Sequence, residues 1–311
     1  MENTTRNLYH DHSDRDFTSE EMNQFIDLAV AGDKNAMEYL LVSVQDLIFN
    51  LALRMLGTIP DAEDAVSEIM IRIMTHLDTF RKESAFSTWA FRIAVNHLKN
   101  YKKSMFAKRP LSFEFYGNDI RNGAAEDIPD PEQKVDQPLL EQELKLSCTN
   151  VMLQCLDPES RCIFILGTMF KADSKIAGEI LNISPEAYRQ RLTRIRKKMA
   201  SFLDEYCELG REGFCRCRKR IPYAMDTHRL NPQNLEYSSL ELLPEDLLIS
   251  CKNAMEQIDD LSLAFSSMPH YLSLIHISEP TRPERISYAV FCLNKKIPIQ
   301  YRCSYLTSAQ S

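Results

Sequence analysis

The chain has 311 residues, a length that suggests about two domains. Apolar residues make up 44% and charged residues 26%, as in an ordinary globular protein, but only 8 residues are glycine. No two glycines form a GxG pattern and none begins GxxxxGK, which argues against a nucleotide site built on a glycine-rich turn. So little glycine also argues against the many tight hairpins of an all-β fold.

The net charge of −7 hides three basic stretches. Residues 81–109 contain eight Lys or Arg and one acidic residue. Residues 186–199 contain six Lys or Arg and one acidic residue, and residues 211–220 contain five Lys or Arg and one acidic residue. Such islands in an acidic chain indicate either local contact with a polyanion or simply solvated helix faces. The polar start, Met1 to Phe17, has no apolar run, so we expect no signal peptide, no membrane span and a cytoplasmic protein with reduced thiols.

After a polar segment 1–20 that we expect to be disordered, apolar residues at helical spacing predict four helices. The first covers about 22–29 and ends at Gly32, and the second begins at Asp33 as N-cap and ends at Gly57. The third opens with Pro60 and Asp61. The fourth, capped by Ser87, runs to about Ser104.

Prolines and acidic residues fill 107–138, which we predict to be a linker with few contacts to either side. Helical spacing returns over 139–155, and Asp157-Pro158-Glu159 is typical of a helix start. A short helix at 174–181, a turn at Asn182-Ile183 and a basic helix opened by Ser184-Pro185 form a helix-turn-helix pattern.

These patterns predict an all-α fold: two helical domains joined by a flexible acidic linker, the second with a helix-turn-helix, followed by a helical C-terminal extension. The domains cover 21–106 and 139–206, and the extension covers 207–271 with one more amphipathic helix over 236–265.

Two stretches carry candidate chemistry in the first domain. Asp61, Asp64 and Glu68 share the outer face of the third helix with Arg72. In the stretch from Phe80 to Lys103, aromatic rings alternate with cations, as single-stranded nucleic acid binding requires; for Phe91 we favour a core position.

The sequences DAEDAVSEI and FRKESAFSTWAFRIAVNHLKN resemble the second conserved region of bacterial sigma factors of the extracytoplasmic-function (ECF) group. LDPESRCIFIL and KIAGEILNISPEAYRQRLTRIRKKM resemble that group's fourth region. The resemblance implies a non-enzymatic subunit that binds core RNA polymerase and directs promoter recognition and melting. Its implied partners are core polymerase and promoter DNA, with an anti-sigma factor as a further candidate.

The resemblance also implies roles for single residues. Polymerase would be bound by Asp61, Asp64, Glu68 and Arg72. The −10 element, with its flipped base and melted strand, would contact Ser84, Phe86, Ser87, Trp89, Arg92, Asn96, Lys99, Asn100 and Lys103. The −35 duplex would face Ser184, Pro185, Glu186, Arg189, Gln190 and Arg194. Tyr188 departs from the family, which favours a small β-branched residue there, and would alter helix packing or base choice.

The C-terminal extension contains Cys207, Cys215 and Cys217, with His228 further on. Three thiols and a histidine are a candidate zinc site, although the spacing is not that of a CxxC pair. Neighbouring Arg and Lys side chains predict lowered thiol pKa values and hence a candidate redox site. Plain reduced cysteines in a basic loop are the alternative.

The last segment, 272–311, contains LSLIHISEPTR and ISYAVFCL, separated by three residues. Both blocks resemble an in-frame translation of a sequencing-library adapter. We therefore expect 272–311 to be a non-native tail without a packed core.

Two other functions remain open. A helix-turn-helix regulator acting without polymerase would need no single-strand platform at 61–103. A thiol or metal sensor would work through 207–228. The scattered histidines show no nucleophile–base or metal-triad spacing, so we predict no enzymatic activity and no cofactor other than the candidate zinc.

Overall fold

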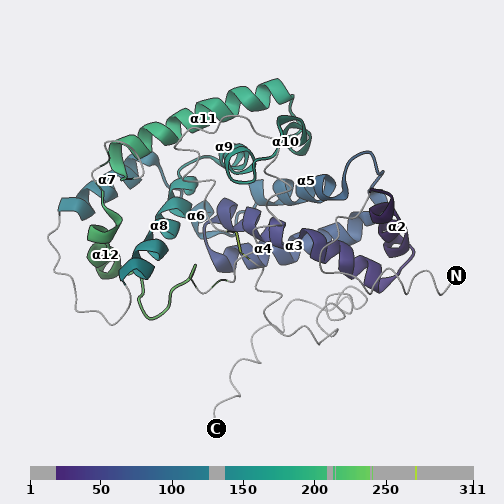
Figure 1. The fold of residues 1–311 in the computed structure, drawn as a ribbon, viewed down its shortest axis with the longest axis horizontal. Coiled ribbons are helices and arrows are strands. Elements are labelled where there is room, and N and C mark those ends of the chain that lie inside the picture. The colour runs from purple at the N-terminus through teal and green to yellow at the C-terminus, as the bar shows by residue number, and fades with distance from the viewer. Residues whose placement is uncertain are drawn as a thin grey trace, which may run out of the picture. The chain divides into compact units, whose positions relative to one another are not determined.

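The computed structural model describes residues 19–125, 137–208, 213, 215–238, 240, 270 and 271. Every regular element within these ranges is helical (Figure 1), which confirms the all-α prediction. Most of the predicted disordered start, most of the predicted helix 236–265 and the adapter-like tail lie outside the described residues, while residues 19 and 20 of that start are already helical.

Helices α2 to α5 form what we call the first half of the molecule. Its centre is α3 (Lys34–Leu56), which packs against α2 (Ser19–Val30), α4 (Ile59–His76) and α5 (Phe86–Lys99). Asp33 caps α3 by accepting a hydrogen bond from the Ala36 amide at 3.0 Å, and Gly57 ends it in the left-handed conformation, as predicted. By length and composition α3 is apolar enough to cross a membrane, but 72% of its most apolar window is buried within the protein. Its apolar surface is therefore explained as core.

Two helix starts differ from the sequence-based expectation. Helix α4 is capped by Thr58, whose hydroxyl accepts from the Asp61 amide at 3.3 Å. Helix α5 begins at Phe86 and ends at Lys99, so Ser87 is not its cap and the helix is shorter than predicted. Burial of the Phe86 ring, which is 4% exposed, explains the earlier start.

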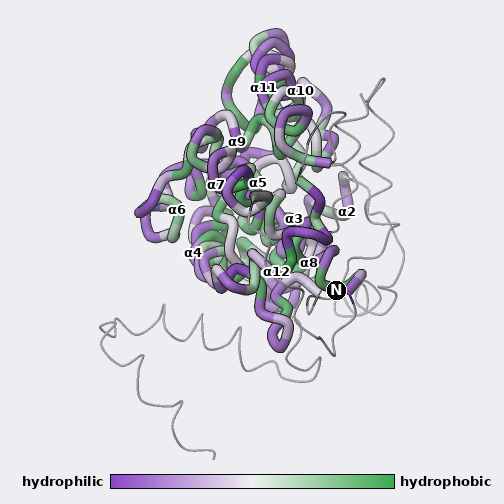
Figure 2. Tube along the Cα trace, turned by 90° about the vertical axis from the view of Figure 1, so that its left-hand side faces the viewer, coloured by the Kyte–Doolittle hydropathy of each residue, from purple (hydrophilic) through white to green (hydrophobic). Residues whose placement is uncertain are grey.

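Helices α8 to α11 form the second half, and they follow one another in the predicted order. Helix α8 (Gln137–Gln154) leads to α9 (Pro158–Phe164), which Asp157 caps and a π-helical turn, η2 (Ile165–Met169), continues. Helices α10 (Ser174–Leu181) and α11 (Pro185–Tyr206) form a helix-turn-helix, with Asn182 in the left-handed conformation between them. Hydrophobic and hydrophilic residues alternate along both helices (Figure 2), as expected for helices buried on one face.

The prediction of a contact-poor linker over 107–138 is wrong for its described part up to residue 125, and the stretch 105–125 contains two helices. This stretch contains α6 (Met105–Lys108) and α7 (Phe113–Ala125), and Tyr116 and Ile120 of α7 are buried in the main core. Two glycines that weaken α7 as a helix permit the contact: a Cβ at Gly117 would lie 2.6 Å from the Tyr206 ring, and one at Gly123 2.6 Å from Tyr223. Close packing against α11 and the C-terminal extension therefore outweighs low helix propensity.

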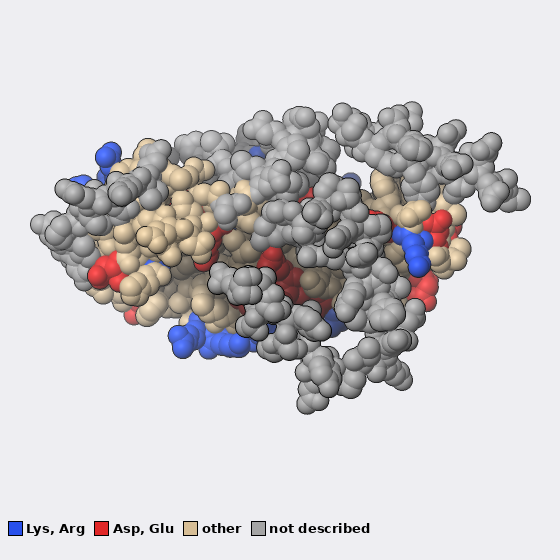
Figure 3. Space-filling model, turned by 90° about the horizontal axis from the view of Figure 1, so that it is seen from below, with Lys and Arg blue, Asp and Glu red and all other residues tan. Residues whose placement is uncertain are grey.

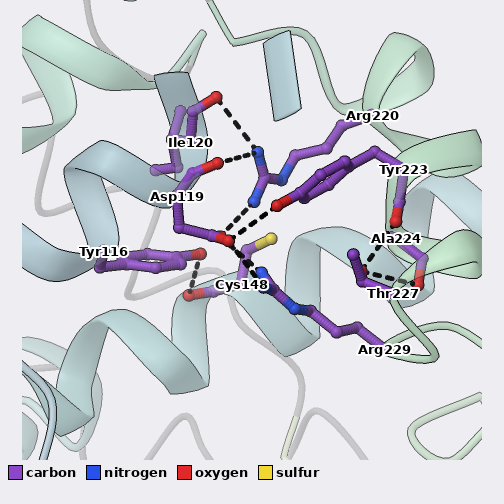
Figure 4. Close-up of polar contacts among 9 residues, drawn as sticks. All are labelled: Tyr116, Asp119, Ile120, Cys148, Arg220, Tyr223, Ala224, Thr227 and Arg229. Atoms are coloured by element: carbon purple, nitrogen blue, oxygen red, sulfur yellow. Dashed lines mark hydrogen bonds and ion pairs between the residues drawn. The ribbon is translucent and has the colours of Figure 1, made fainter. Parts of the chain in front are cut away.

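The C-terminal extension is partly helical as well. Helix α12 (Cys217–Asp226) packs on α7 and α8, where a plain basic loop had been the alternative prediction. Asp119 of α7 binds Arg220 at 2.6 Å, Arg229 at 2.5 Å and the Tyr223 hydroxyl at 3.0 Å (Figure 4). This group of charges, in which Asp119 and Arg220 are largely buried and Arg229 is exposed, ties the extension to the segment that was predicted to be a linker.

Candidate nucleic-acid interface

Helix α4 carries the four residues implied to bind polymerase, but they do not form one free acidic face. Asp61 is half-buried, and one of its carboxylate oxygens accepts the Thr58 hydroxyl at 2.8 Å and the Met105 amide at 3.1 Å. Glu68 pairs with Lys103 at 2.6 Å, whereas Asp64 and Arg72 are exposed. Asp61 therefore also has a structural role at the start of α4.

A pocket of about 690 Å³ lies between α4 and the end of α5. It brings together six of the predicted site residues from the polymerase and −10 groups. Its lining consists of Glu68, Arg72, His76, Thr79, Trp89, Ile93, Asn96, His97, Asn100, Tyr101, Lys102 and Lys103. A surface that combines an indole, two amides and cations at the mouth of one pocket suits unpaired bases and their backbone.

His97 and Tyr101 in this pocket were missed by the sequence analysis. His97 approaches Glu68 at 3.5 Å, and burial, followed by the Arg72 charge, lowers its pKa. The Lys103 hydrogen bond and charge lower the pKa of Glu68 despite its partial burial. The signal in the sequence was the helical spacing of His97 and Tyr101 from Ile93.

Three aromatic rings form one cluster beside the pocket. Trp89 lies 5.3 Å from Phe80 and 5.9 Å from Phe86, measured between ring centroids. Phe86 is buried, whereas Trp89 is only half-buried and lines the pocket. Of the two predicted loop serines, Ser84 is half-buried and Ser87 is exposed.

The middle of α5 faces the second half of the molecule. Phe91 is buried against Phe170 at 5.9 Å, which confirms its core position. Arg92, predicted to contact the melted strand, donates instead to the Glu179 carbonyl at 3.2 Å and pairs with the Glu179 carboxylate at 3.3 Å. Lys99 is half-buried.

Helix α11 presents its predicted contact residues on the exposed side. Ser184 caps the helix by accepting from the Ala187 amide at 3.1 Å, and Pro185 occupies the first turn. Arg189 donates to the Ser174 hydroxyl at 2.9 Å and pairs with Glu186 at 3.0 Å. The exposed row consists of Glu186, Arg189, Gln190 and Arg194.

Tyr188 is a packing residue. It is 1% exposed, and its hydroxyl donates to the Ile163 carbonyl at 3.3 Å. Tyr188 therefore lies on the packed side of α11, away from the exposed row.

The four candidate zinc ligands are not assembled. Cys207 and Cys215 face each other across a short parallel bridge, while His228 is exposed in a turn. Among the residues that the structure describes, no three His, Cys, Asp or Glu side chains are grouped to hold a metal ion.

The predicted lowering of thiol pKa values is wrong for two of the cysteines. Burial raises the pKa of Cys215 to about 12 and raises that of Cys217 as well. The exposed neighbours Arg216, Arg218 and Lys219 do not offset this desolvation.

The face seen in Figure 3 shows basic and acidic side chains in separate small groups. This separation agrees with the uneven charge of the sequence.

Residues 40–105 match the family described as sigma-70 region 2. The RNA polymerase sigma-H factor of Pseudomonas aeruginosa is 33% identical over 122 residues, which cover 37% of this chain and 62% of that protein. The ECF RNA polymerase sigma-E factor of Escherichia coli K12 is 37% identical over 105 residues, 32% of this chain and 54% of that protein. The chain thus spans about half to six-tenths of these relatives' length.

Among solved structures, CnrH in complex with the cytosolic domain of CnrY is 22% identical, with a TM-score of 0.42 over 58% of this chain and 95% of that one. All the residues that line the pocket between α4 and α5 lie within the matched region, 40–105. Residues 40–105 therefore match the sigma-70 region 2 family, and the similar proteins are RNA polymerase sigma factors, one of them of the ECF group.

Proposed function

We propose that the chain is a sigma factor that binds core RNA polymerase and directs promoter recognition and melting. The observation that carries the proposal is the pocket between α4 and α5, because it joins residues implied for polymerase with residues implied for the −10 element. The family match covers the same helices.

Promoter melting would use the aromatic and polar side of this pocket. Trp89 offers an indole ring for stacking on an unpaired base, and Asn96 and Asn100 offer amides that are exposed to solvent. Lys102 and Lys103 supply positive charge for the backbone of the displaced strand. Flipping a base costs a few kcal/mol, which stacking of this kind can offset.

Recognition of the −35 element would use α11. Its first turns carry Arg189 and Gln190 on the exposed side, and a side chain of either type can make two hydrogen bonds to a base edge in the major groove. Arg194 lies one turn further along, where it can contact a phosphate.

Core polymerase would be bound through the exposed Asp64 and Arg72 of α4, with Glu68 at the pocket edge. The proposal includes a cytoplasmic, non-enzymatic role and keeps an anti-sigma factor as a predicted partner. A regulator that acts without polymerase is less favoured, because it would not need the pocket between α4 and α5.

The test is run-off transcription with purified bacterial core polymerase, the full chain and a library of random promoter fragments. We expect the chain to bind core polymerase and to select fragments that share two spaced elements. Duplex binding without any binding to core polymerase would overturn the proposal in favour of the regulator.

A further inference from the structure

Two polar side chains interrupt the most apolar helix of the protein. Asn50 and Arg54 of α3 are 0% and 1% exposed, and they lie four residues apart on one face of the helix. Burying an amide and a guanidinium is costly unless they have partners. Their positions therefore indicate a specific contact at this face of α3.

Asn50 binds the main chain of a residue 221 positions away. Its amide nitrogen donates to the Tyr271 carbonyl at 2.7 Å, and its amide oxygen accepts from the Tyr271 amide at 2.8 Å. One side chain thus satisfies both backbone groups of Tyr271, as a neighbouring strand would in a sheet. Such a contact recognises an extended peptide.

Arg54 recognises the side chain of the same residue. Its guanidinium lies 5.6 Å from the centroid of the Tyr271 ring, and Tyr271 is 1% exposed. A cation over an aromatic face is stabilised most where both groups are removed from water. Asn50 therefore binds the backbone of Tyr271, and Arg54 binds its aromatic ring.

A second part of the extension is held by Glu143 of α8, which is 4% exposed. One carboxylate oxygen accepts from the amides of Glu236 and Tyr237 at 2.7 and 2.9 Å. The other accepts from the Ser238 amide at 2.9 Å and its hydroxyl at 2.8 Å. Four donors on one carboxylate make this a strong anchor.

Both contacts lie where the two halves of the molecule meet. Gln154 of α8 donates to the Arg54 carbonyl at 3.1 Å, next to the Tyr271 site. Tyr237, held on α8, donates to the carbonyl of Gly57 at the end of α3 at 3.4 Å. His270 packs edge-on against Phe170 at 5.4 Å, on the side of the second half. Each contact thus touches both halves.

We propose that Asn50 and Arg54 form a peptide-docking site whose occupant is the chain's own His270–Tyr271, and that this contact and the Glu143 anchor hold the two halves together. We call residues 236–238 and 270–271 the C-terminal strap. The occupant is this chain because the second anchor fixes the same extension to α8.

The strap has a functional consequence that rests on the proposed function. With the halves held together, Arg92 is paired with Glu179 and is not available to a melted strand. Release of the strap lets α10 separate from α5 and frees Arg92. The strap therefore restrains promoter melting until it is displaced.

The test is single-molecule energy transfer in the full chain. Dyes are attached to an azide-bearing amino acid introduced at Asp78 of the first half and at Lys197 of the second, both exposed. The variants are Tyr271→Ala, Glu143→Gln and the double variant. Phe115→Ala and Glu114→Gln, at exposed positions outside the strap, are the matched controls.

We expect the double variant to raise the ratio of open to closed molecules about tenfold, as the loss of roughly one net buried contact predicts. The controls are expected to match the unmodified chain. Circular dichroism identifies any variant that fails to fold. Glu143→Gln keeps one acceptor oxygen for the Glu236 and Tyr237 amides, so it serves if the double variant does not fold.

An unchanged ratio of open to closed molecules in the folded variants would overturn the proposal that the strap holds the two halves together. Binding of core polymerase, measured on the same samples, separates the strap from the proposed function. If no sample binds core polymerase while the ratio rises, the proposed function fails and the strap stands.

Discussion

The two basic helices of the molecule differ in how their charges are used. On α11, Arg189, Gln190 and Arg194 are exposed, and the partners of Arg189 come from its own helix and from the start of α10. On α5 and just after it, Arg92 is paired with Glu179 of the other half and Lys103 is paired with Glu68. The α11 surface is ready for a ligand, whereas the α5 surface is partly occupied by the protein itself.

A basic stretch in a sequence therefore does not by itself reveal an available surface. Residues 81–109 and 186–199 look alike in charge, but Arg92 of the first is paired across the two halves, whereas Arg189 and Arg191 of the second are paired within one half. We therefore expect duplex binding by α11 to be independent of the arrangement of the halves, and binding of a melted strand by α5 to depend on it.

The largest expected effect concerns the support behind α11. Asp119→Ala leaves the buried Arg220 without its carboxylate, and removing one partner of a buried pair costs about 3–5 kcal/mol of the free energy of unfolding. Urea denaturation measures the loss. Asn122→Ala, at an exposed position of the same helix, is the control and is expected to change little.

The same pair predicts a pH dependence. Burial tends to raise the pKa of Asp119, but hydrogen bonds and charge from Arg229, with Arg220 and Tyr223, lower it below its ordinary value of 3.8. A depressed carboxyl pKa stabilises the folded state above the unfolded value and loses that effect as the pH falls through the folded value. The gap between the unmodified chain and Asp119→Ala should narrow below about pH 4; a constant gap down to pH 2 would contradict this assignment.

The next effect tests whether α11 reads bases. Arg189→Ala is expected to cost roughly 1–3 kcal/mol on a duplex with the preferred −35 sequence, and less on a duplex with altered bases. Competition binding with the two duplexes measures the difference. Lys197→Ala, at an exposed position further along the helix, controls for loss of charge. Equal weakening on both duplexes would reduce Arg189 to a phosphate contact.

A comparable effect is expected from the α5 side. Trp89→Ala removes a ring from the pocket, and stacking on an unpaired base is worth roughly 1–3 kcal/mol. Permanganate footprinting of open complexes should show impaired melting, while −35 duplex binding stays unchanged. Trp89→Phe keeps a ring and should retain part of the activity. Normal melting by the alanine variant would show that Trp89 serves only the core.

The smallest effect addresses the contrast between the helices directly. Glu179→Gln removes the charge that holds Arg92, and an exposed pair of this kind contributes only about 0–1 kcal/mol to stability. We expect an unchanged melting temperature and tighter binding of single-stranded DNA, measured by fluorescence anisotropy. Glu159→Gln, which releases Arg191 of α11 from another exposed pair, is the matched control. Equal affinity in both variants would mean that Arg92 is already available.

Much of the fold could be predicted because helix boundaries are local. The Asp33 cap, the Gly57 end and the Asp157-Pro158 start depend on groups within a few residues of each other, so the sequence pattern contains them. The Ser184-Pro185 start and the Asn182 turn belong to the same class. The resemblance to sigma factors implied the residues of the candidate site, whereas their assembly in one pocket depends on the packing of α4 against α5.

The remaining features depend on residues far apart in the chain. Helix α7 has two glycines, and its partner Arg220 lies 101 residues from Asp119, so no local pattern predicts it. The pKa of Cys215 is raised because burial in the tertiary structure outweighs the neighbouring charges of the sequence.

Periodicity and capping act over one or two turns, so local patterns predict the helical class and the order of the helices. The contact row on α11 was implied by the resemblance to sigma factors. By contrast, the packing of the helices establishes the pairing of Arg92 across the two halves and the contact of Asn50 with Tyr271. Such pairings depend on which buried polar groups find partners once the helices have packed, and desolvation makes those choices specific.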